Sequence, residues 1–228
     1  MTEQSNKMLP VITIDGPSGV GKGTMSAMLA KHLNWNYLDS GALYRLTGLA
    51  AVKQNLNWEQ EQEIAKVAVQ LDVVFETDGK ILLQGENVAD DIRTRESASN
   101  ASKVAAIPAV REALLQRQKD FLSAPGLVAD GRDMGTTVFP TAANKIFLTA
   151  SPECRGERRY KQLIEKQNGA ILPGSLEQIV VEIRERDERD MNRSSSPLRA
   201  AEDAVTIDTS DLSIDEVFQQ ILKVCNLN

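Results

Sequence analysis

A glycine-rich segment near the start of the sequence could hold a chain of phosphates. It reads Gly16-Pro-Ser-Gly-Val-Gly21-Lys22 and lies between the apolar run Val11–Ile14 and a predicted helix. The spacing matches G-x-x-x-x-G-K, in which backbone N–H groups and a helix N-terminus face an anion while the lysine reaches the β- and γ-phosphates. A plain strand–helix turn would gain nothing from the lysine. The predicted ATP-binding residues are Gly16, Pro17, Ser18, Gly19, Val20, Gly21, Lys22, Gly23 and Thr24.

The residue after this lysine departs from the usual pattern. Serine or threonine normally stands there and supplies a hydroxyl to Mg²⁺, whereas this chain has Gly23 followed by Thr24. We therefore predict no direct protein ligand for Mg²⁺, which nucleotide oxygens and water would hold. Asp130 would act on the ion through water, although a turn-stabilising role for this aspartate is an equally good interpretation. Thr24 is expected to serve a phosphate.

Several later motifs narrow the class of protein. The GKGT ending of the first motif resembles the nucleoside monophosphate kinases. The segments "DSGALYR", "IRTRESASNASKVAAIPAVREALLQRQ", "GLVADGRDMGTTVFP" and "RERDERDMNRSSSPL" resemble the bacterial cytidylate kinases within that class. These motifs occur in the order of the family, and the resemblance covers nearly the whole chain. The resemblance implies phosphoryl transfer from ATP to CMP or dCMP with Mg²⁺, a step of pyrimidine nucleotide metabolism.

A reaction of this kind needs cationic side chains that bring two anionic substrates together. Arg45 lies about one turn into a predicted helix that follows the second predicted strand. Arg132 follows the third strand, at the sheet edge where ligands of open α/β sheets bind. Arg186, Asp190 and Arg193 are spaced i, i+4, i+7, which predicts one helical face. On the residues alone, a solvated helix face explains Arg45. A self-paired, solvated helix is the favoured interpretation of the i, i+4, i+7 set.

The resemblance implies an individual role for each acceptor-site position. It assigns the CMP phosphate to Arg45, Arg132 and Arg193, and the ribose hydroxyls to Arg186 and Asp190. Cytosine would be bound by Asp133, Ser102 and Arg111. From spacing alone, Ser102 and Arg111 look like ordinary surface residues. A carboxylate or hydroxyl accepts from the N4 amino group of cytosine, and an arginine donates to N3 or O2, whereas uracil presents a carbonyl instead of the amino group. The implied CMP site is Ser40, Arg45, Ser102, Arg111, Arg132, Asp133, Arg186, Asp190 and Arg193.

Three further arginines, Arg155, Arg158 and Arg159, are spaced i, i+3, i+4 on one predicted helix. They are similar to lid arginines that close over the ATP phosphates, where they would stabilise charge on the transferred group and exclude water. A surface helix with Glu157 as their partner is the alternative. The candidate catalytic residues are Lys22, Arg132, Arg155, Arg158 and Arg159. By analogy, Thr206–Asp211 would lie near the adenine.

Apolar runs that alternate with helical segments predict the frame that must position these groups. The runs are apolar on both faces, as strands of a parallel sheet are. The predicted strands are Val11–Ile14, Trp35–Leu38, Leu127–Ala129, Ile146–Leu148 and Val205–Ile207. The predicted helices between or after them are Gly21–Leu33, Ala42–Gln54, Ala109–Leu122 and Ile214–Val224. This alternation predicts an α/β fold, a P-loop three-layer α/β/α architecture around a five-stranded parallel sheet.

Two segments interrupt the alternation within a predicted single kinase domain, 1–228. Residues 57–96 begin with a predicted helix, Trp58–Gln70, capped by Asn57, and continue with two β-rich runs around Asp78-Gly79 that suit a type I′ hairpin. This segment is the predicted NMP-binding insert. Residues 151–199 are helical and arginine-rich, with helix starts at Ser151 and Ser175, and are the predicted lid and following helix. The core would then comprise 8–56, 97–150 and 200–228.

Composition limits the remaining classes. The chain has 228 residues, a net charge of −6 and a pI near 5.0, which argue against a general nucleic-acid or membrane-surface binder. No apolar signal segment or span of about 18 apolar residues is visible. One histidine argues against a histidine triad, and Cys154 and Cys225 form no redox or metal motif. We expect a cytoplasmic protein without nucleic-acid or membrane partners, and the resemblance to the family implies a monomer.

Three other functions compete with this interpretation. A P-loop GTPase would need an N-K-x-D motif, which neither Asn6-Lys7 nor Asn144-Lys145 begins. Another nucleoside monophosphate kinase, such as one that prefers UMP, is disfavoured by the Asp-Gly-Arg-Asp turn and by the insert. A non-enzymatic nucleotide-binding scaffold would not need Arg45, Arg132 and Arg193 to converge on a second phosphate. The UMP kinase and the scaffold stay open as alternatives.

Overall fold

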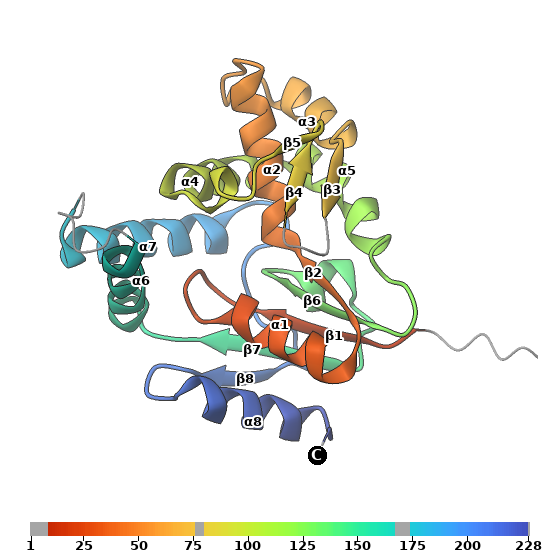
Figure 1. Ribbon diagram of the computed structural model, residues 1–228, viewed down its shortest axis with the longest axis vertical. Helices are drawn as coiled ribbons and strands as arrows, with labels where there is room; N and C mark the ends of the chain where they lie inside the picture. The colour runs from red at the N-terminus through yellow and green to blue at the C-terminus, as the bar shows by residue number, and fades with distance from the viewer. Residues whose placement is uncertain (1–8, 76–79, 167–173, 228) are drawn as a thin grey trace, which may run out of the picture.

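A five-stranded parallel sheet lies at the centre of the computed structural model, which describes residues 9–75, 80–166 and 174–227 (Figure 1). The strand order is β2-β6-β1-β7-β8. The strands are β1 (Val11–Asp15), β2 (Asn36–Asp39), β6 (Leu127–Gly131), β7 (Asn144–Thr149) and β8 (Val205–Asp208). All five predicted strands are thus confirmed, with small shifts at their ends. The glycine-rich segment follows β1, the middle strand, so it starts at the centre of the carboxyl edge.

Helices cover both faces of this sheet, which confirms the predicted three-layer architecture. The principal covering helices are α1 (Lys22–Leu33), α8 (Ile214–Val224), α2 (Ser40–Lys53) and α5 (Pro108–Lys119). Ile12 and Ile14 share one core with α1 and α8, whereas Val11 and Leu127 share the other with α2 and α5. Neighbouring residues of β1 thus enter opposite cores. This explains why the strand is apolar along its whole length.

The segment after α2 forms a small unit of its own secondary structure. It contains α3 (Glu61–Val69), a three-stranded antiparallel sheet of β3 (Val73–Phe75), β4 (Ile81–Leu83) and β5 (Glu86–Asn87), the 3₁₀ turn η1 (Asp91–Arg93) and α4 (Arg95–Val104). The antiparallel β3–β4 pairing confirms the predicted hairpin strands, while the Asp78-Gly79 turn lies outside the described residues. Buried residues of α3 join the same core as β6. The proposed limits of the insert, 57–96, stay a prediction.

The insert differs from expectation in two places. Asn57 is not the N-cap of α3, because the helix begins at Glu61 after Gln60. The Asn57 side chain instead accepts from the Glu59 N–H at 3.0 Å, which stabilises a turn before the helix. The helix α4 was not predicted, because its sequence is rich in serine, asparagine and charged residues and shows few apolar positions. Packing against α2 supplies the stability that its composition does not suggest.

The arginine-rich region consists of two helices that pack against each other, α6 (Pro152–Lys166) and α7 (Leu176–Asn192) (Figure 1). Both predicted helix starts are confirmed: Ser151 Oγ accepts from the Cys154 N–H at 3.1 Å, and Ser175 forms a capping box with Gln178. Residues 167–173, between these two helices, lie outside the described residues. One expectation is wrong. Helix α7 ends at Asn192, so Arg193 follows the helix with extended backbone instead of continuing its face.

A second capping box begins α8. Ser213 Oγ accepts from the Glu216 N–H at 3.3 Å, and Glu216 Oε2 accepts from the Ser213 N–H at 2.8 Å. We expect Ser213→Ala to lower the free energy of unfolding by about 1 kcal/mol in urea titrations, because it leaves helix N–H groups without an acceptor. Gln219→Ala, at an exposed position of α8, is the control. Equal losses in both variants would show that the cap contributes nothing.

Candidate active site

A cavity of about 640 Å³ opens at the carboxyl edge of the sheet. Its walls come from α1, α2, α4, α5, α6, α7 and α8 and from the turn after β6. The predicted site residues that line it are Ser18, Gly19, Val20, Gly21, Lys22, Gly23, Thr24, Ser40, Arg45, Ser102, Arg111, Asp130, Arg132, Asp133, Arg158, Arg186, Asp190 and Arg193. Its lining does not include Gly16, Pro17, Arg155 or Arg159. Every residue predicted for the acceptor nucleotide therefore lines the same cavity as the glycine-rich loop.

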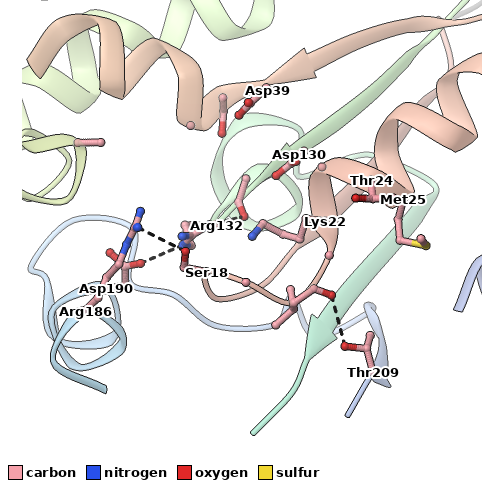
Figure 2. A pocket seen from close by; sticks show the side chains of 18 of the residues that line it. Ser18, Lys22, Thr24, Met25, Asp39, Asp130, Arg132, Arg186, Asp190 and Thr209 are labelled. Atoms are coloured by element: carbon pink, nitrogen blue, oxygen red, sulfur yellow. Dashed lines mark hydrogen bonds and ion pairs between the residues drawn. The ribbon is translucent and has the colours of Figure 1, made fainter. Parts of the chain in front are cut away.

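The glycine-rich loop wraps around its own lysine. Gly16 has φ +147°, and a Cβ there would lie 2.1 Å from the Leu148 carbonyl oxygen of β7, so only glycine fits. Lys22 is buried, and its Nζ donates to the Pro17 carbonyl at 2.8 Å. Burial, together with the charge of the nearby Arg132, lowers the pKa of Lys22 to about 7 (Figure 2). The loop thus holds a cation that an anionic ligand would stabilise.

Asp130 lies next to the position that usually carries the P-loop hydroxyl. A Cβ on Gly23 would lie 3.5 Å from Asp130 Oδ2 and 3.7 Å from the Tyr37 hydroxyl. The Tyr37 hydroxyl donates to Asp130 Oδ2 at 3.3 Å. Burial raises the pKa of Asp130 to about 6, although the charge of Lys22 opposes this. Asp39 stands beside Asp130 in the register of the neighbouring strands β2 and β6, and it also lines the cavity.

Sequence reasoning gave no role to Tyr37 or Asp39. Each stands near the end of β2, and both come close to Asp130 only because β2 and β6 are neighbours in the sheet. No local sequence motif specifies this strand order. A polar or aromatic residue at a predicted carboxyl strand end was the only available signal.

Arg111 and Asp133 form a buried ion pair inside this cavity. Arg111 Nη2 donates to Asp133 Oδ2, and the two side chains are 6% and 3% exposed. The Arg111 guanidinium lies 5.5 Å from the centre of the Tyr44 ring. Ser102 is buried as well, and within the described part of the chain no hydrogen-bond partner reaches its hydroxyl. Ser102 and Arg111 are therefore not the surface residues that their spacing suggested.

Further cations gather around the glycine-rich loop (Figure 2). Arg132 Nε donates to Asp190 Oδ2 at 2.9 Å, and Arg186 Nη1 donates to the Ser18 hydroxyl at 3.3 Å. Burial lowers the pKa of Arg186 to about 10, with Arg132 adding to the effect. Although burial alone would raise the pKa of Asp190, Arg132 and Arg186 hold it below its usual value. Arg132 thus has a carboxylate partner, whereas Arg186 donates to a neutral hydroxyl.

The three lid arginines lie close together but differ in their contacts. Arg155 is buried and donates to the Ser18 carbonyl at 3.1 Å and to both carboxylate oxygens of Asp187. Arg158 donates to the Thr209 hydroxyl at 3.0 Å and lines the main cavity. All three arginines line a second cavity of about 500 Å³ between the insert and the lid helices. Their i, i+3, i+4 spacing places them on the same side of α6, which is why one cavity can receive all three.

Comparison with known proteins decides the family. The sequence model described as cytidylate kinase matches residues 12–227. The chain belongs to the cytidylate kinase family. The cytidylate kinase of Shewanella denitrificans is 53% identical over 219 residues, which cover 94% of this chain and 95% of the relative. That of Shewanella putrefaciens is 55% identical over 222 residues, 95% of each chain. The resemblance inferred from the motifs is thus confirmed.

Among solved structures, a shikimate kinase from Bacteroides thetaiotaomicron aligns with this protein. The alignment covers 96% of this chain and 99% of the shikimate kinase chain. The TM-score is 0.46 and the sequence identity is 11%.

The buried lysine generates a prediction on stability. Because the pKa of Lys22 is lowered in the fold, this group destabilises the ligand-free protein below the unfolded-state pKa, and the penalty fades as the pH rises towards 10.5. We expect Lys22→Met to raise the free energy of unfolding at pH 7 by about 2 kcal/mol, after the lost Pro17 hydrogen bond is deducted.

Urea titrations of the ligand-free protein at pH 7 and pH 9.5 measure this difference, which should shrink at the higher pH. Lys31→Met is the control, because Lys31 is exposed on the same helix. A Lys22→Met variant that is less stable than the parent at pH 7 would contradict the prediction.

Proposed function

We propose that this cytidylate kinase family member transfers the γ-phosphoryl group of ATP to CMP or dCMP, giving ADP and CDP or dCDP. The observation that carries the proposal is the buried Arg111–Asp133 pair, which lines the same cavity as the glycine-rich loop. One cavity therefore offers groups for a triphosphate and a hydrogen-bonding pair for a base. The two relatives described above are both cytidylate kinases, which agrees with this combination.

ATP would lie with its phosphates along residues 18–24 and its adenine towards the end of β8. Lys22 would leave the Pro17 carbonyl and contact the β- and γ-phosphates. Burial disfavours the charged form of this lysine in the ligand-free protein, and a bound phosphate would stabilise that form. The acceptor phosphate would bind Arg45, Arg132 and Arg193. The protein's contribution is then positioning and charge neutralisation, since phosphoryl transfer demands little covalent chemistry from side chains.

Cytosine would bind against Asp133, Arg111 and Ser102. The Asp133 carboxylate accepts from the N4 amino group, and Arg111 or the Ser102 hydroxyl reaches the remaining edge of the base. Both charged groups already form a buried ion pair, so their positions are set before the base arrives. Uracil would place its O4 carbonyl against the carboxylate, an acceptor facing an acceptor, which carries a large penalty in a buried site.

The ribose hydroxyls would be bound by Arg186 and Asp190. The carboxylate of Asp190 is held in its charged form by Arg132 and Arg186, so it can accept from both hydroxyls while one oxygen keeps its bond to Arg132. In the lid, Arg158 and Arg159 would stabilise the charge on the transferred group. We assign Arg155 a positioning role, because its buried guanidinium joins the Ser18 carbonyl to Asp187 of α7.

The carboxylates near Gly23 suit Mg²⁺, because it is a hard cation that prefers oxygen ligands. Asp130 and Asp39 would hold the ion through water, with the Tyr37 hydroxyl fixing the orientation of Asp130. Within the described residues, no group of three or more histidine, cysteine or acidic side chains is arranged to hold a metal ion. When bound, Mg²⁺ neutralises the phosphate oxygens.

We propose that the protein works as a monomer in the cytoplasm, without nucleic-acid or membrane partners. The net charge of −6 supports the absence of a nucleic-acid partner, because phosphate backbones bind positive surfaces. In the part of the chain that the structure describes, none of the helices is long and apolar enough to cross a membrane.

Steady-state phosphorylation of CMP, dCMP, UMP and AMP by the purified protein tests the proposed function. We expect kcat/KM for CMP and dCMP to exceed that for UMP and AMP by at least about 100-fold, since an unpaired buried acceptor costs about 1–3 kcal/mol and two contacts are mismatched. Equal rates with UMP and CMP would contradict the role of the Arg111–Asp133 pair. ATP hydrolysis without preference for any acceptor would favour the nucleotide-binding scaffold.

A substitution of Asp133 separates the two halves of the site. Asp133→Asn keeps the shape of the side chain but offers an amide, which can donate to the O4 carbonyl of uracil. We expect KM for CMP to rise at least about ten-fold and the preference for CMP over UMP to fall by a similar factor, while KM for ATP stays within about two-fold. Asp120→Asn, at the exposed end of α5, is the control. A rise confined to KM for ATP would refute the placement of Asp133 at the acceptor.

A further inference from the structure

The carboxylate of Asp15 makes a connection that the proposed chemistry does not use. Asp15 ends β1, directly before the first glycine of the phosphate-binding loop, and is 5% exposed. Its Oδ1 accepts from the Met134 N–H and its Oδ2 from the Gly135 N–H, each at 2.8 Å. Both donors stand 119 or more positions away in the chain. One buried side chain therefore binds the start of the ATP loop to the segment that follows β6.

That segment carries the residues proposed to contact CMP. It is a π-helical turn, η2 (Met134–Val138), with i→i+5 hydrogen bonds such as the Phe139 N–H to the Met134 carbonyl at 2.7 Å. Arg132 and Asp133 directly precede its first residue. The position of this turn therefore sets where the guanidinium and the carboxylate enter the cavity.

The same turn also reaches the third cationic residue of the acceptor side. The Thr137 hydroxyl donates to the Ser196 hydroxyl at 3.3 Å, and Arg193 Nε donates to the Ser196 carbonyl at 2.6 Å. A chain of contacts thus runs from Asp15 through η2 to Arg193. Displacement of η2 would move acceptor-site residues on two separate segments.

Close packing holds η2 against β1 next to the Asp15 contact. A Cβ added to Gly135 would lie 2.9 Å from the Thr13 hydroxyl and 3.2 Å from Lys145 Cδ. Gly135 is therefore needed for the short approach that brings its N–H to Asp15. The hydrogen bonds and the packing act on the same residue from the same strand.

We propose that Asp15 is a positioning residue for the acceptor half of the site, which fixes Arg132 and Asp133 through its two hydrogen bonds to η2. This inference rests on the proposed CMP kinase function. Only a carboxylate of this size presents two acceptor oxygens to two adjacent N–H groups. An asparagine keeps one acceptor but turns an N–H group towards the other backbone N–H, which would push η2 away.

The decisive comparison is between the two substrates. In the full-length protein, KM for CMP is measured at saturating ATP, and KM for ATP at saturating CMP, for the parent and for Asp15→Asn. We expect KM for CMP to rise at least about ten-fold and the preference for CMP over UMP to fall, while KM for ATP changes by less than about three-fold. Asp120→Asn is the control for loss of an aspartate. Equal rises in the two KM values, or no rise for CMP, would overturn the proposal.

Activity of the parent protein with CMP is read in the same assay. Absence of that activity would refute the proposed function itself, whereas an active parent with an unaltered Asp15→Asn variant would refute only the role of Asp15.

A second pair of variants tests the junction if Asp15→Asn does not fold. Gly135→Ala should raise KM for CMP several-fold without the same change for ATP, because its methyl group meets the Thr13 hydroxyl and displaces η2. Adding Thr13→Ala removes that hydroxyl and should bring KM for CMP back to within about two-fold of the Thr13→Ala value. An unchanged KM for CMP in Gly135→Ala, or a failure of Thr13→Ala to restore it, would overturn the proposal.

Discussion

Buried positive charge at one edge of the sheet is the constraint on which the rest of the structure depends. Lys22, Arg111 and Arg155 are each less than one tenth exposed, and burial lowers the pKa of Lys22 to about 7. An ion in such a place is tolerated only with a partner or hydrogen bonds. The carboxylates of Asp133 and Asp187 supply partners for the two arginines, and the loop's own carbonyl supplies one for the lysine.

The compensation is incomplete in a way that suits two polyanionic substrates. Arg186 keeps a weak contact with the Ser18 hydroxyl, and burial and Arg132 together lower its pKa to about 10. Arg159 likewise has a lowered pKa through burial and through Arg45 and Arg95. Phosphate groups would relieve this repulsion. Substrate binding and the stability of the fold are therefore linked, because a ligand that binds only the folded state stabilises it.

Local sequence signals predicted the elements well and their contacts poorly. The five strands, the phosphate-binding loop and the caps at Ser151 and Ser175 were all predictable, because each depends on residues within a few positions of one another. The N-cap at Asn57 was wrong because an asparagine also stabilises turns. The helix α4 escaped prediction because its stability comes from packing against α2 and not from apolar periodicity. The placement of Arg193 on the face of α7 failed because the helix ends one residue earlier.

The sequence by itself determined that a strand, a phosphate-binding loop and a helix follow one another, and its motifs identified the family. Only the tertiary structure decided which side chains meet. Arg111 with Asp133, Arg132 with Asp190, and Asp15 with η2 are separated by 22, 58 and about 119 positions. These contacts exist because β6 lies between β2 and β1 and because α4 and α5 pack beside them. Strand order and helix packing are set by the whole core, so no local spacing could reveal them.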